Sequence, residues 1–306
     1  MSGATELAET PLIRELLARC TFPVNALDAA PEQLECAVSG GADSSALLVL
    51  AVASGAAVTA HHVDHGFRPN SAAEADTVAA LAERFGAQFA SHRVEVEHGP
   101  NLEARARAAR YSVLPTSVAT GHTLDDRAET ILINLVRGAA RSGLTPLRDP
   151  HRHPISALRR SETVQLCAEL EIEAVQDVTN SDPAYQRNRM RHEALPLLDA
   201  IASRDVAAVL DRQAAVLALE DDLLDELAAE IDVVDALALS AAHPALARRA
   251  VRAWILENWG CEHPPSVASV DRVLDVAAGK VRSTQIAGGY HVLRRAQRLR
   301  IEPPSR

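Results

Sequence analysis

The sequence predicts an α/β fold: a doubly wound parallel sheet followed by a second, smaller and mainly helical domain. Between residues 34 and 200, short apolar segments alternate with amphipathic segments of helical period, which is typical of parallel strands joined by helical crossovers. Residues 204–231 are rich in Ala, Leu, Asp and Glu, and their apolar residues have the spacing that is typical of helices. A chain of 306 residues is long enough for two modest domains that each bury a core.

The elements of the first domain follow from these segments in chain order. The apolar run from Leu34 to Val38 ends near a glycine pair and predicts the first strand, and the helix after it begins near Asp43, a residue type favoured at helix N-termini. Each later strand is likewise short and apolar and is followed by a polar loop. The expected strands lie near residues 34–38, 57–63, 88–95, 116–120 and 153–157, and the expected helices near 43–53, 71–86, 101–113, 124–137 and 160–171.

The rest of the chain flanks this alternating region. We expect a helical N-terminal extension over residues 1–33 and a helix over 187–198 that closes the first domain near residue 200. Toward the C-terminus, Gly288-Gly289 lies between apolar stretches, which is typical of a hairpin. The expected domains are residues 1–33, 34–200 and 201–306.

The segment Ser39–Ser44 (Ser-Gly-Gly-Ala-Asp-Ser) joins the first strand to the following helix and has the features of a nucleotide phosphate site. Gly40 and Gly41 permit positive φ and let backbone N–H groups approach an anion closely. The helix N-terminus adds unpaired N–H groups and its dipole, and the two serines add hydroxyl donors. The alternative is an ordinary strand-to-helix turn with Asp43 as its cap.

This loop lacks the Gly-Lys-Ser/Thr of a Walker A loop and the Gly-x-Gly-x-x-Gly of a Rossmann cofactor site. It resembles the Ser-Gly-Gly-x-Asp-Ser loop of the ATP pyrophosphatases, which split ATP between its α and β phosphates. The resemblance implies an adenylated intermediate rather than phosphoryl transfer.

Asp125, Asp126 and Glu129 fall within about one helical turn, and His122 lies at the strand end just before them. Three acids beside a triphosphate site suggest the handling of a cationic substrate and the binding of Mg²⁺, for which Asp125 and Asp126 are the candidates. Thr123 to Asp126 is also similar to a capping box. In that alternative Asp126 serves only to cap the helix.

Histidines and arginines form two other motifs, one at the end of a strand and one at the start of a helix. In a strand His62 and Asp64 point to one face and His61 to the other, so a closed tetrahedral metal cluster is not expected. We instead expect His62, Asp64 and His65 to contact the nucleotide or substrate. The run Arg187–Arg191 places three guanidinium groups within five residues, which suits RNA phosphates or the ATP phosphates.

Four further motifs accompany the phosphate loop, and their order and spacing are informative. They are His-Val-Asp-His-Gly-Phe-Arg (62–68), Glu-Ala-Arg-Ala-Arg-Ala-Ala-Arg-Tyr (103–111), Ala-Thr-Gly-His-Thr-Leu-Asp-Asp-Arg-Ala-Glu-Thr (119–130) and the segment 177–191. Over about residues 34–200 the set resembles the bacterial tRNA(Ile)-lysidine synthetases.

The resemblance implies a PP-loop fold similar to the adenine-nucleotide α-hydrolases, and a ligase reaction. ATP adenylates the C2 carbonyl oxygen of the wobble cytidine in a CAU-anticodon tRNA(Ile), and pyrophosphate leaves. The ε-amino group of free L-lysine then attacks C2, and AMP departs. The implied cofactors are ATP and Mg²⁺.

The resemblance also implies roles for residues, and the proton acceptor stays open among Asp125, Asp126 and His122. The implied catalytic residues are Asp43, His122, Asp125 and Asp126. The implied ATP contacts are Ser39, Gly40, Gly41, Ala42, Asp43, Ser44, His62, Asp64 and Gly121. The implied substrate and tRNA contacts are Arg107, Arg110, Tyr111, Glu129, Arg137, Asp177, Asn180, Arg187, Asn188, Arg189 and Arg191.

Two alternatives stay open. A tRNA 2-thiolation enzyme of the same fold would accept sulfur, but such relatives usually carry paired cysteines, and the four cysteines here form no Cys-x-x-Cys pair. A non-catalytic nucleotide-binding protein would leave the acidic cluster unexplained. The chain also departs from the family in having His153-Pro154-Ile155 where Arg-Pro-Leu is common. Longer members have an additional C-terminal domain, and we expect no counterpart of it here.

The net charge of −10 at first argues against a nucleic-acid partner, but the charge is uneven. Residues 199–235 hold eleven acids and two bases, a net of −9, whereas residues 243–306 hold eleven bases and five acids, a net of +6. We therefore expect the second domain to contact tRNA. No apolar run approaches the ~18 residues of a membrane span, and the N-terminus is unlike a signal peptide, so a cytoplasmic protein without a membrane partner is expected. Whether two copies form a homodimer stays open.

Overall fold

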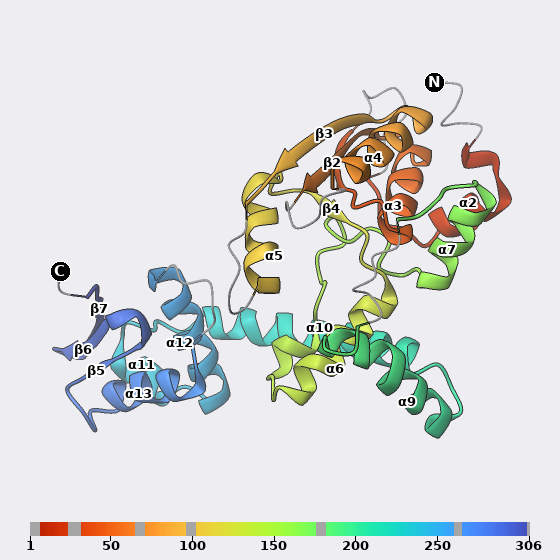
Figure 1. The fold of residues 1–306 in the computed structure, drawn as a ribbon. Coiled ribbons are helices and arrows are strands. Elements are labelled where there is room, and N and C mark those ends of the chain that lie inside the picture. Colours follow the sequence, from red (N-terminus) through yellow and green to blue (C-terminus); the bar gives the residue numbers. More distant parts are fainter. Residues whose placement is uncertain are drawn as a thin grey trace. The chain divides into compact units, whose positions relative to one another are not determined.

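The computed structural model describes residues 7–23, 32–64, 71–95, 102–175, 182–259 and 265–304. The chain forms two compact units, Met1–Ala215 and Val216–Arg306. Figure 1 shows a sheet with surrounding helices in the first unit, and helices with a small sheet in the second. Across the described residues, no helix is both long enough and apolar enough to span a bilayer.

The sheet of unit 1 is parallel, as predicted. Its strands β1 (Gln33–Ala37), β2 (Ala57–Asp64), β3 (Gln88–Arg93) and β4 (Ala119–Thr120) are ordered β3-β2-β1-β4. Helices α3 (Ala42–Ala53), α4 (Ser71–Phe85), α5 (Leu102–Val113) and α6 (Leu124–Val136) alternate with them along the chain. The carboxyl ends of β1 and β4 are neighbours, so the loops that follow these strands lie at one edge of the sheet.

The prediction of a strand at residues 153–157 is wrong. This segment forms turns, closed by bonds such as Ser156 N to His153 O (3.0 Å) and Leu158 N to Ile155 O (2.9 Å). Pro154 has no N–H to donate to a ladder, which disfavours a strand here. The apolar character that suggested a strand has another cause, because Ile155 and Leu158 are both fully buried in the core.

The N-terminal segment belongs to unit 1 rather than standing apart as an extension. Helix α2 (Pro11–Leu17) buries Ile13 and Leu16 completely in the same core as α3. Beyond the helix, Arg19 forms an ion pair with Glu162 of α7 (Arg160–Glu169). The described part of residues 1–33 therefore contributes to the stability of unit 1.

The helical end of unit 1 extends farther than expected. The segment expected as a helix over 187–198 is helical, as α8 (Gln186–Arg189), a π-helical turn (Met190–Ala194) and α9 (Leu195–Ala202). Along the chain, the boundary between the two units falls between Ala215 and Val216, inside α10 (Val206–Ala229), and not near residue 200. The first part of α10 packs into unit 1, because Ala207 is buried against α6 and α9, and Asp211 pairs with Arg127.

Unit 2 combines helices with an antiparallel sheet. Helices α11 (Ala236–Ala241), α12 (Pro244–Trp259) and α13 (Val267–Ala277) precede strands β5 (Ser283–Gln285), β6 (His291–Arg295) and β7 (Arg298–Glu302). Its core includes Val251, Ile255, Val273, Val292 and Leu299. The expected hairpin is confirmed: Gln285 pairs with His291, and Gly288 and Gly289 have φ of 73° and 79° in the turn between them.

Candidate active site

The loop between β1 and α3 has a conformation that requires glycine. Gly40 has a φ of +84°, and a Cβ atom there would lie 2.9 Å from Cγ2 of Val175. The carbonyl oxygen of Gly40 accepts a hydrogen bond from Val175 N (2.9 Å), so the loop is also fixed from outside. Any larger residue at Gly40 would be strained by its backbone and would displace Val175.

Ser44 fixes the loop from within. Its hydroxyl accepts from Ser39 N (3.1 Å), lies 3.2 Å from Ser39 Oγ, and donates to the carbonyl oxygen of Gly41 (2.9 Å). These bonds hold the loop against the first turn of α3. The side chain of Ser44 therefore shapes the loop as well as lining the space in front of it.

Gly121 brings the end of β4 against this loop. A Cβ atom on Gly121 would lie 2.7 Å from the carbonyl oxygen of Asp43 and 2.9 Å from Ser44 N, both backbone atoms. Only glycine allows this approach without displacing the backbone. The Ser39–Ser44 loop and the segment that follows β4 therefore lie against each other.

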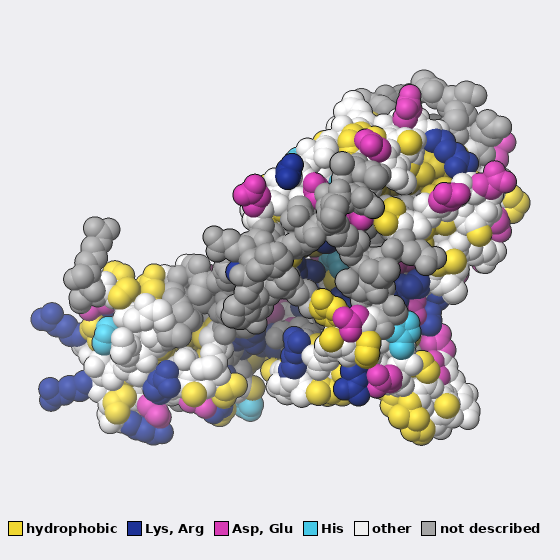
Figure 2. Space-filling view, in the orientation of Figure 1, with side chains coloured by type: hydrophobic (Ala, Val, Ile, Leu, Met, Phe, Trp, Pro, Cys, Tyr) yellow, Lys and Arg dark blue, Asp and Glu magenta, His cyan; other side chains and the backbone are white. Residues whose placement is uncertain are grey.

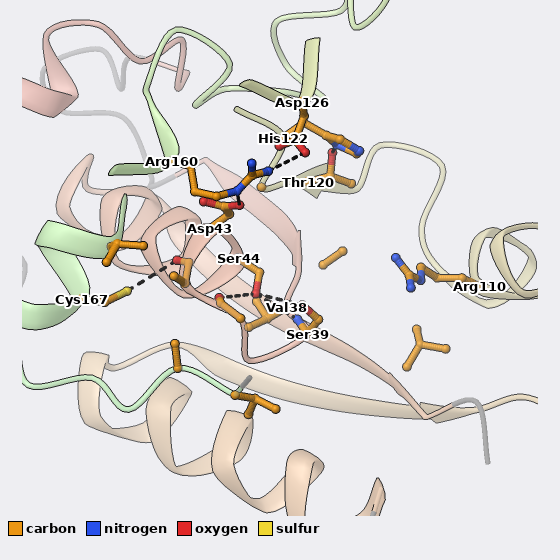
Figure 3. Close-up of a pocket in the computed structure, with 18 of the residues that line it drawn as sticks. Val38, Ser39, Asp43, Ser44, Arg110, Thr120, His122, Asp126, Arg160 and Cys167 are labelled. Atoms are coloured by element: carbon orange, nitrogen blue, oxygen red, sulfur yellow. Dashed lines mark hydrogen bonds and ion pairs between the residues drawn. The ribbon is translucent and has the colours of Figure 1, made fainter. Parts of the chain in front are cut away.

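A cavity of about 1030 Å³ opens in front of the loop (Figure 3). Its lining combines backbone and hydroxyl groups with arginines, three histidines and carboxylates, a mixture suited to a phosphorylated ligand. The expected residues that line it are Ser39, Gly41, Ala42, Asp43, Ser44, Arg107, Arg110, Tyr111, Gly121, His122, Asp126, Arg187 and Arg191. The expected residues that are described but do not line it are Gly40, His62, Asp64, Asp125, Glu129, Arg137, Asn188 and Arg189. Asp177, Asn180 and His65 lie outside the described residues.

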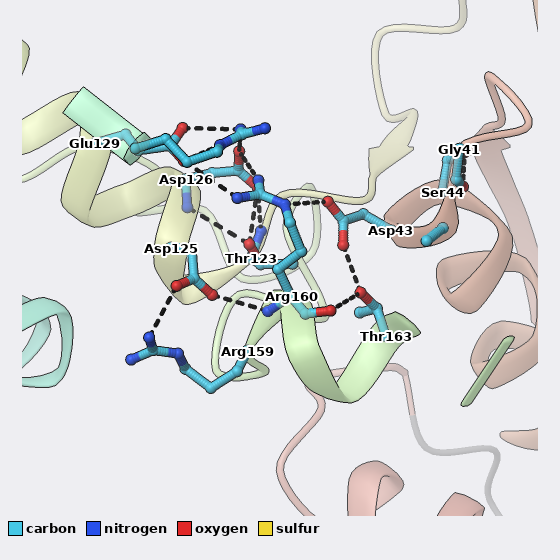
Figure 4. Close-up of polar contacts among 12 residues, drawn as sticks. Gly41, Asp43, Ser44, Thr123, Asp125, Asp126, Glu129, Arg159, Arg160 and Thr163 are labelled. Atoms are coloured by element: carbon cyan, nitrogen blue, oxygen red, sulfur yellow. Dashed lines mark hydrogen bonds and ion pairs between the residues drawn. The ribbon is translucent and has the colours of Figure 1, made fainter. Parts of the chain in front are cut away.

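Arg160, which sequence reasoning missed, connects three carboxylates beside the cavity (Figure 4). Its guanidinium donates to Asp43 (3.1 Å), Asp126 (2.8 Å) and Glu129 (3.1 Å). One signal was present in the sequence: an arginine in the first turn of a helix opposes the helix dipole, so it needs anionic partners. Arg160 thereby links the phosphate loop to α6.

Two more arginines meet the same carboxylates from the helical end of unit 1. Arg187 donates to Glu129 (2.7 Å) and Asp126 (2.9 Å), and Arg191 makes a two-point contact with Glu129 (2.7 and 3.2 Å). Glu129 has no solvent exposure. We call Asp43, Asp126, Glu129, Arg160, Arg187 and Arg191 the charged cluster.

Asp126 both caps a helix and borders the cavity. It caps α6, because Thr123 N donates to Oδ2 (2.8 Å) and the Thr123 hydroxyl accepts from Asp126 N (3.4 Å). It also lines the cavity. Burial disfavours its ionised form, but the guanidiniums of Arg160 and Arg187 outweigh burial and lower the pKa of Asp126 to about 2. Asp126 is therefore an anion at neutral pH.

Asp43 is held at the start of α3 by Arg160 and by the hydroxyl of Thr163. Burial raises the pKa of Asp43, although both partners favour the ionised form. The carboxylate thus joins the loop to α7, and the loop cannot shift without disturbing the charged cluster.

The expected Mg²⁺ pair does not fit this geometry. Asp125 faces away from Asp126, accepting from Arg160 N (2.8 Å) and the guanidinium of Arg159 (2.9 Å). Both oxygens of Asp126 accept hydrogen bonds from the Thr123 backbone and two guanidiniums. No cluster of three or more metal-ligating side chains occurs within the described ranges. The two carboxylates therefore have separate partners and do not converge on one shared metal ion.

His122 lies beside Asp126 in a small network of neutral groups. Its Nδ1 is 2.6 Å from the Thr120 hydroxyl, which also lies 2.8 Å from Nδ1 of His153 and 3.1 Å from the carbonyl oxygen of Arg152. That hydroxyl has one proton, so all three bonds form only if both histidines donate through Nδ1. Burial lowers the pKa of His122 to about 4, which leaves Nε2 as a neutral proton acceptor at pH 7.

The histidines of β2 have opposite surroundings, as strand alternation predicts. His61, rather than His62, lines the cavity, and its ring nitrogens contact Glu35 (2.5 Å) and His92 (2.8 Å). His62 is buried on the other face, with Nδ1 3.0 Å from the carbonyl oxygen of Val38. The structure thus gives His62 a part in holding β2 against β1.

Helix α5 contributes an aromatic ring between two cations. The guanidiniums of Arg107 and Arg152 lie 5.1 and 5.5 Å from the centre of the Tyr111 ring, and Arg107, Arg110 and Tyr111 line the cavity. The Tyr111 ring therefore contacts guanidiniums from two separate segments of the chain.

Three other expected residues have structural partners. Arg137 donates to Gln186 (3.0 Å), Arg189 pairs with Glu193 on the exposed surface (2.9 Å), and buried Asn188 donates to the carbonyl oxygen of Asp182 (2.8 Å). These contacts hold α8 in place. The segment Arg187–Arg191 therefore sends Arg187 and Arg191, but not Arg189, into the cavity.

Comparison with known proteins agrees with this geometry. The model of the PP-loop domain family matches residues 13–198. A Nocardia farcinica protein named tRNA(Ile)-lysidine synthase is 40% identical over 272 residues, covering 84% of this chain and 84% of the relative. A Mycobacterium leprae protein of the same name is 41% identical over 241 residues, covering 72% and 74%.

A solved structure shares the fold. The U34-tRNA thiolase NcsA from Methanococcus maripaludis, solved with its [4Fe-4S] cluster, aligns with a TM-score of 0.54 at 16% identity. The alignment covers 68% of this chain and 80% of the thiolase. At this identity the likeness concerns the fold alone.

Proposed function

We propose that this chain, which belongs to the tRNA(Ile)-lysidine synthase family, is a ligase that uses ATP to join L-lysine to C2 of the wobble cytidine in CAU-anticodon tRNA(Ile). AMP and pyrophosphate are the other products. The observation that carries the proposal is one cavity bordered by both a PP-loop and a cluster of paired carboxylates and arginines. The two halves suit the two steps of the reaction.

In the first step the C2 oxygen attacks the α-phosphorus of ATP, and pyrophosphate leaves. We place the departing phosphates at the Ser39–Ser44 loop, where backbone N–H groups and the α3 dipole oppose developing negative charge. Arg160, which is bonded to Asp43, is placed to meet the same charge. Because Asp125 and Asp126 do not fit a metal pair, we propose that Mg²⁺ enters on the ATP phosphates.

In the second step a lysine amine attacks C2, and AMP leaves with the original C2 oxygen. Free lysine carries an α-carboxylate and two amines, so its site needs both anions and cations, as the charged cluster provides. We assign its carboxylate to Arg187 or Arg191 and an amine to Asp126, which remains ionised. The attacking amine must lose protons, since its reference pKa is ~10.4, and the neutral Nε2 of His122 is the proposed acceptor.

The same features disfavour sulfur transfer in this chain. A sulfur acceptor has no need of a zwitterion site. Of the cysteines in the described part of the chain, Cys20, Cys36 and Cys167 are free thiols, and Cys167 alone lines the cavity. A site for nucleotide sensing alone would likewise not require that Arg187 and Arg191 border the cavity.

Asp126→Asn is expected to raise the KM for lysine about 10- to 100-fold, because the amide cannot pair with an ammonium ion. Asparagine still accepts a backbone hydrogen bond as a cap. The measurement is lysine-dependent release of AMP, with pyrophosphate release followed in parallel. Asp125→Asn is the matched control: this neighbouring carboxylate does not line the cavity, so the KM for lysine should stay near wild type. Equal lysine KM values in wild type and Asp126→Asn would remove Asp126 from the lysine site.

A further inference from the structure

The sheet of unit 2 has one buried and one solvent-facing side. Val292 and Leu299 point into the core, where both have at most 1% exposure. Strand register places Arg295 opposite Arg298, and Leu293 opposite Arg300, on the other side. The solvent-facing side of β6 and β7 therefore carries three arginines, and we call it the arginine face.

Positive charge is concentrated at this end of the unit. From Lys280 to Glu302 the chain has six basic residues and one acid. Figure 2 shows Lys and Arg side chains projecting from the part of unit 2 that carries the three strands. The basic excess of residues 243–306 therefore has a definite location.

The helices of the same unit use their arginines internally. Arg248 pairs with Asp271 (2.9 Å), and Arg249 pairs with Asp221 and Asp225 (2.5 and 2.6 Å). On the sheet, by contrast, neither Arg295 nor Arg300 has a carboxylate partner among the described residues. Their charge is available to a ligand.

The hairpin that presents these arginines is locally unfavourable. Arg295 and Arg298 are directly opposed like charges, an arrangement that destabilises a strand pair. The two-residue turn between them places Ala296 and Gln297 at φ of 50° and 62°, a left-handed conformation that favours Gly or Asn. Both features oppose folding, and an anionic ligand on this face would offset the repulsion.

We propose that the arginine face binds the phosphate backbone of the tRNA substrate without reading its sequence; this inference rests on the proposed function. Guanidinium groups suit phosphate because they donate two hydrogen bonds in one plane. Beside its arginines the face presents Ser283, Gln285, His291, Leu293 and one acid, Glu302, which lies opposite His291 at the far end from Arg295. None of these residues is a Phe, Tyr or Trp that would stack on bases. The arginine face thus adds affinity for tRNA, and other parts of the chain recognise the anticodon.

The test is the Arg295→Gln/Arg300→Gln double variant of the full chain, with binding to tRNA(Ile) and to an unrelated tRNA measured against salt concentration. Loss of two phosphate contacts should lower the affinity for both RNAs equally, by about tenfold at ~0.1 M salt. It should also reduce the slope of log K against log salt by about 1.4–1.8. The rate of lysine incorporation at saturating tRNA should not change.

Arg248→Gln is the matched control, since Arg248 is an exposed arginine of the same unit that is already paired with Asp271. Wild-type affinity in the double variant, an unchanged salt slope, or an equal loss in Arg248→Gln would overturn the proposal. Selective loss for tRNA(Ile) alone would also overturn it, because that result means sequence reading. A different outcome would contradict only the proposed function: the double variant loses tRNA affinity as expected, but the wild-type chain never incorporates lysine.

Discussion

Glu129→Gln is expected to destabilise unit 1 by about 3–5 kcal/mol, the usual consequence of removing one partner from a buried ion pair. Glu129 is fully buried, and its two oxygens accept four hydrogen bonds from Arg160, Arg187 and Arg191. The amide has one acceptor oxygen, and its NH₂ group would face guanidinium donors. Within the charged cluster, the three partly buried guanidiniums would then be balanced by only Asp43 and Asp126.

Urea unfolding can report this effect with an internal reference. Both tryptophans, Trp254 and Trp259, belong to unit 2. The far-UV circular dichroism transition of unit 1 should move to lower urea, while the tryptophan fluorescence transition stays in place. Glu193→Gln, which breaks the exposed pair with Arg189, should move neither transition. A Glu129→Gln protein as stable as the wild type would mean that the charged cluster is not needed to hold unit 1.

Gly121→Val should abolish pyrophosphate release. Even a Cβ atom at this position would lie 2.7 Å from the carbonyl oxygen of Asp43, and that contact is with backbone, which cannot rotate away. The end of β4 and the phosphate loop would separate, so the loop would lose its position relative to His122 and Asp126. Gly121→Ala should have a smaller effect in the same direction.

Gly86→Ala is the control for this pair. Gly86 has a positive φ of 74° with open space around it, so alanine there costs roughly 1 kcal/mol of backbone strain without a clash. The stability of the Gly86→Ala protein should fall, while its rate of pyrophosphate release at 25 °C should stay near that of the wild type. Retained pyrophosphate release in a folded Gly121→Val protein would show that close approach of β4 is not required for the first step.

The phosphate loop and the regular elements of the sheet were predictable because their signals are local. A strand, two glycines and a helix start occur within Leu34–Asp43, and the loop needs nothing from elsewhere to be identified. The segment 153–157 was not predictable in the same way. Apolar residues that fill a core as turns have the same composition as a short buried strand, and only Pro154 argued against one.

The charged cluster depends on tertiary contacts, which sequence spacing does not contain. Arg160 lies 117 residues from Asp43 and 34 from Asp126, yet it bonds to both. Strand alternation separated His61 from His62 correctly but could not say which face of β2 borders the cavity. Asp125 and Asp126 are adjacent in sequence, and the structure gives their carboxylates different partners.

The central claim is that one cavity activates a tRNA cytidine with ATP and then joins it to lysine. The most direct measurement is the mass of the modified nucleoside from CAU-anticodon tRNA(Ile) incubated with the full chain, ATP, Mg²⁺ and lysine, with sulfide offered in a parallel reaction. The expected product is cytidine heavier by one lysine less one water, formed only when ATP and lysine are both present. A product formed with sulfide and never with lysine would contradict the claim.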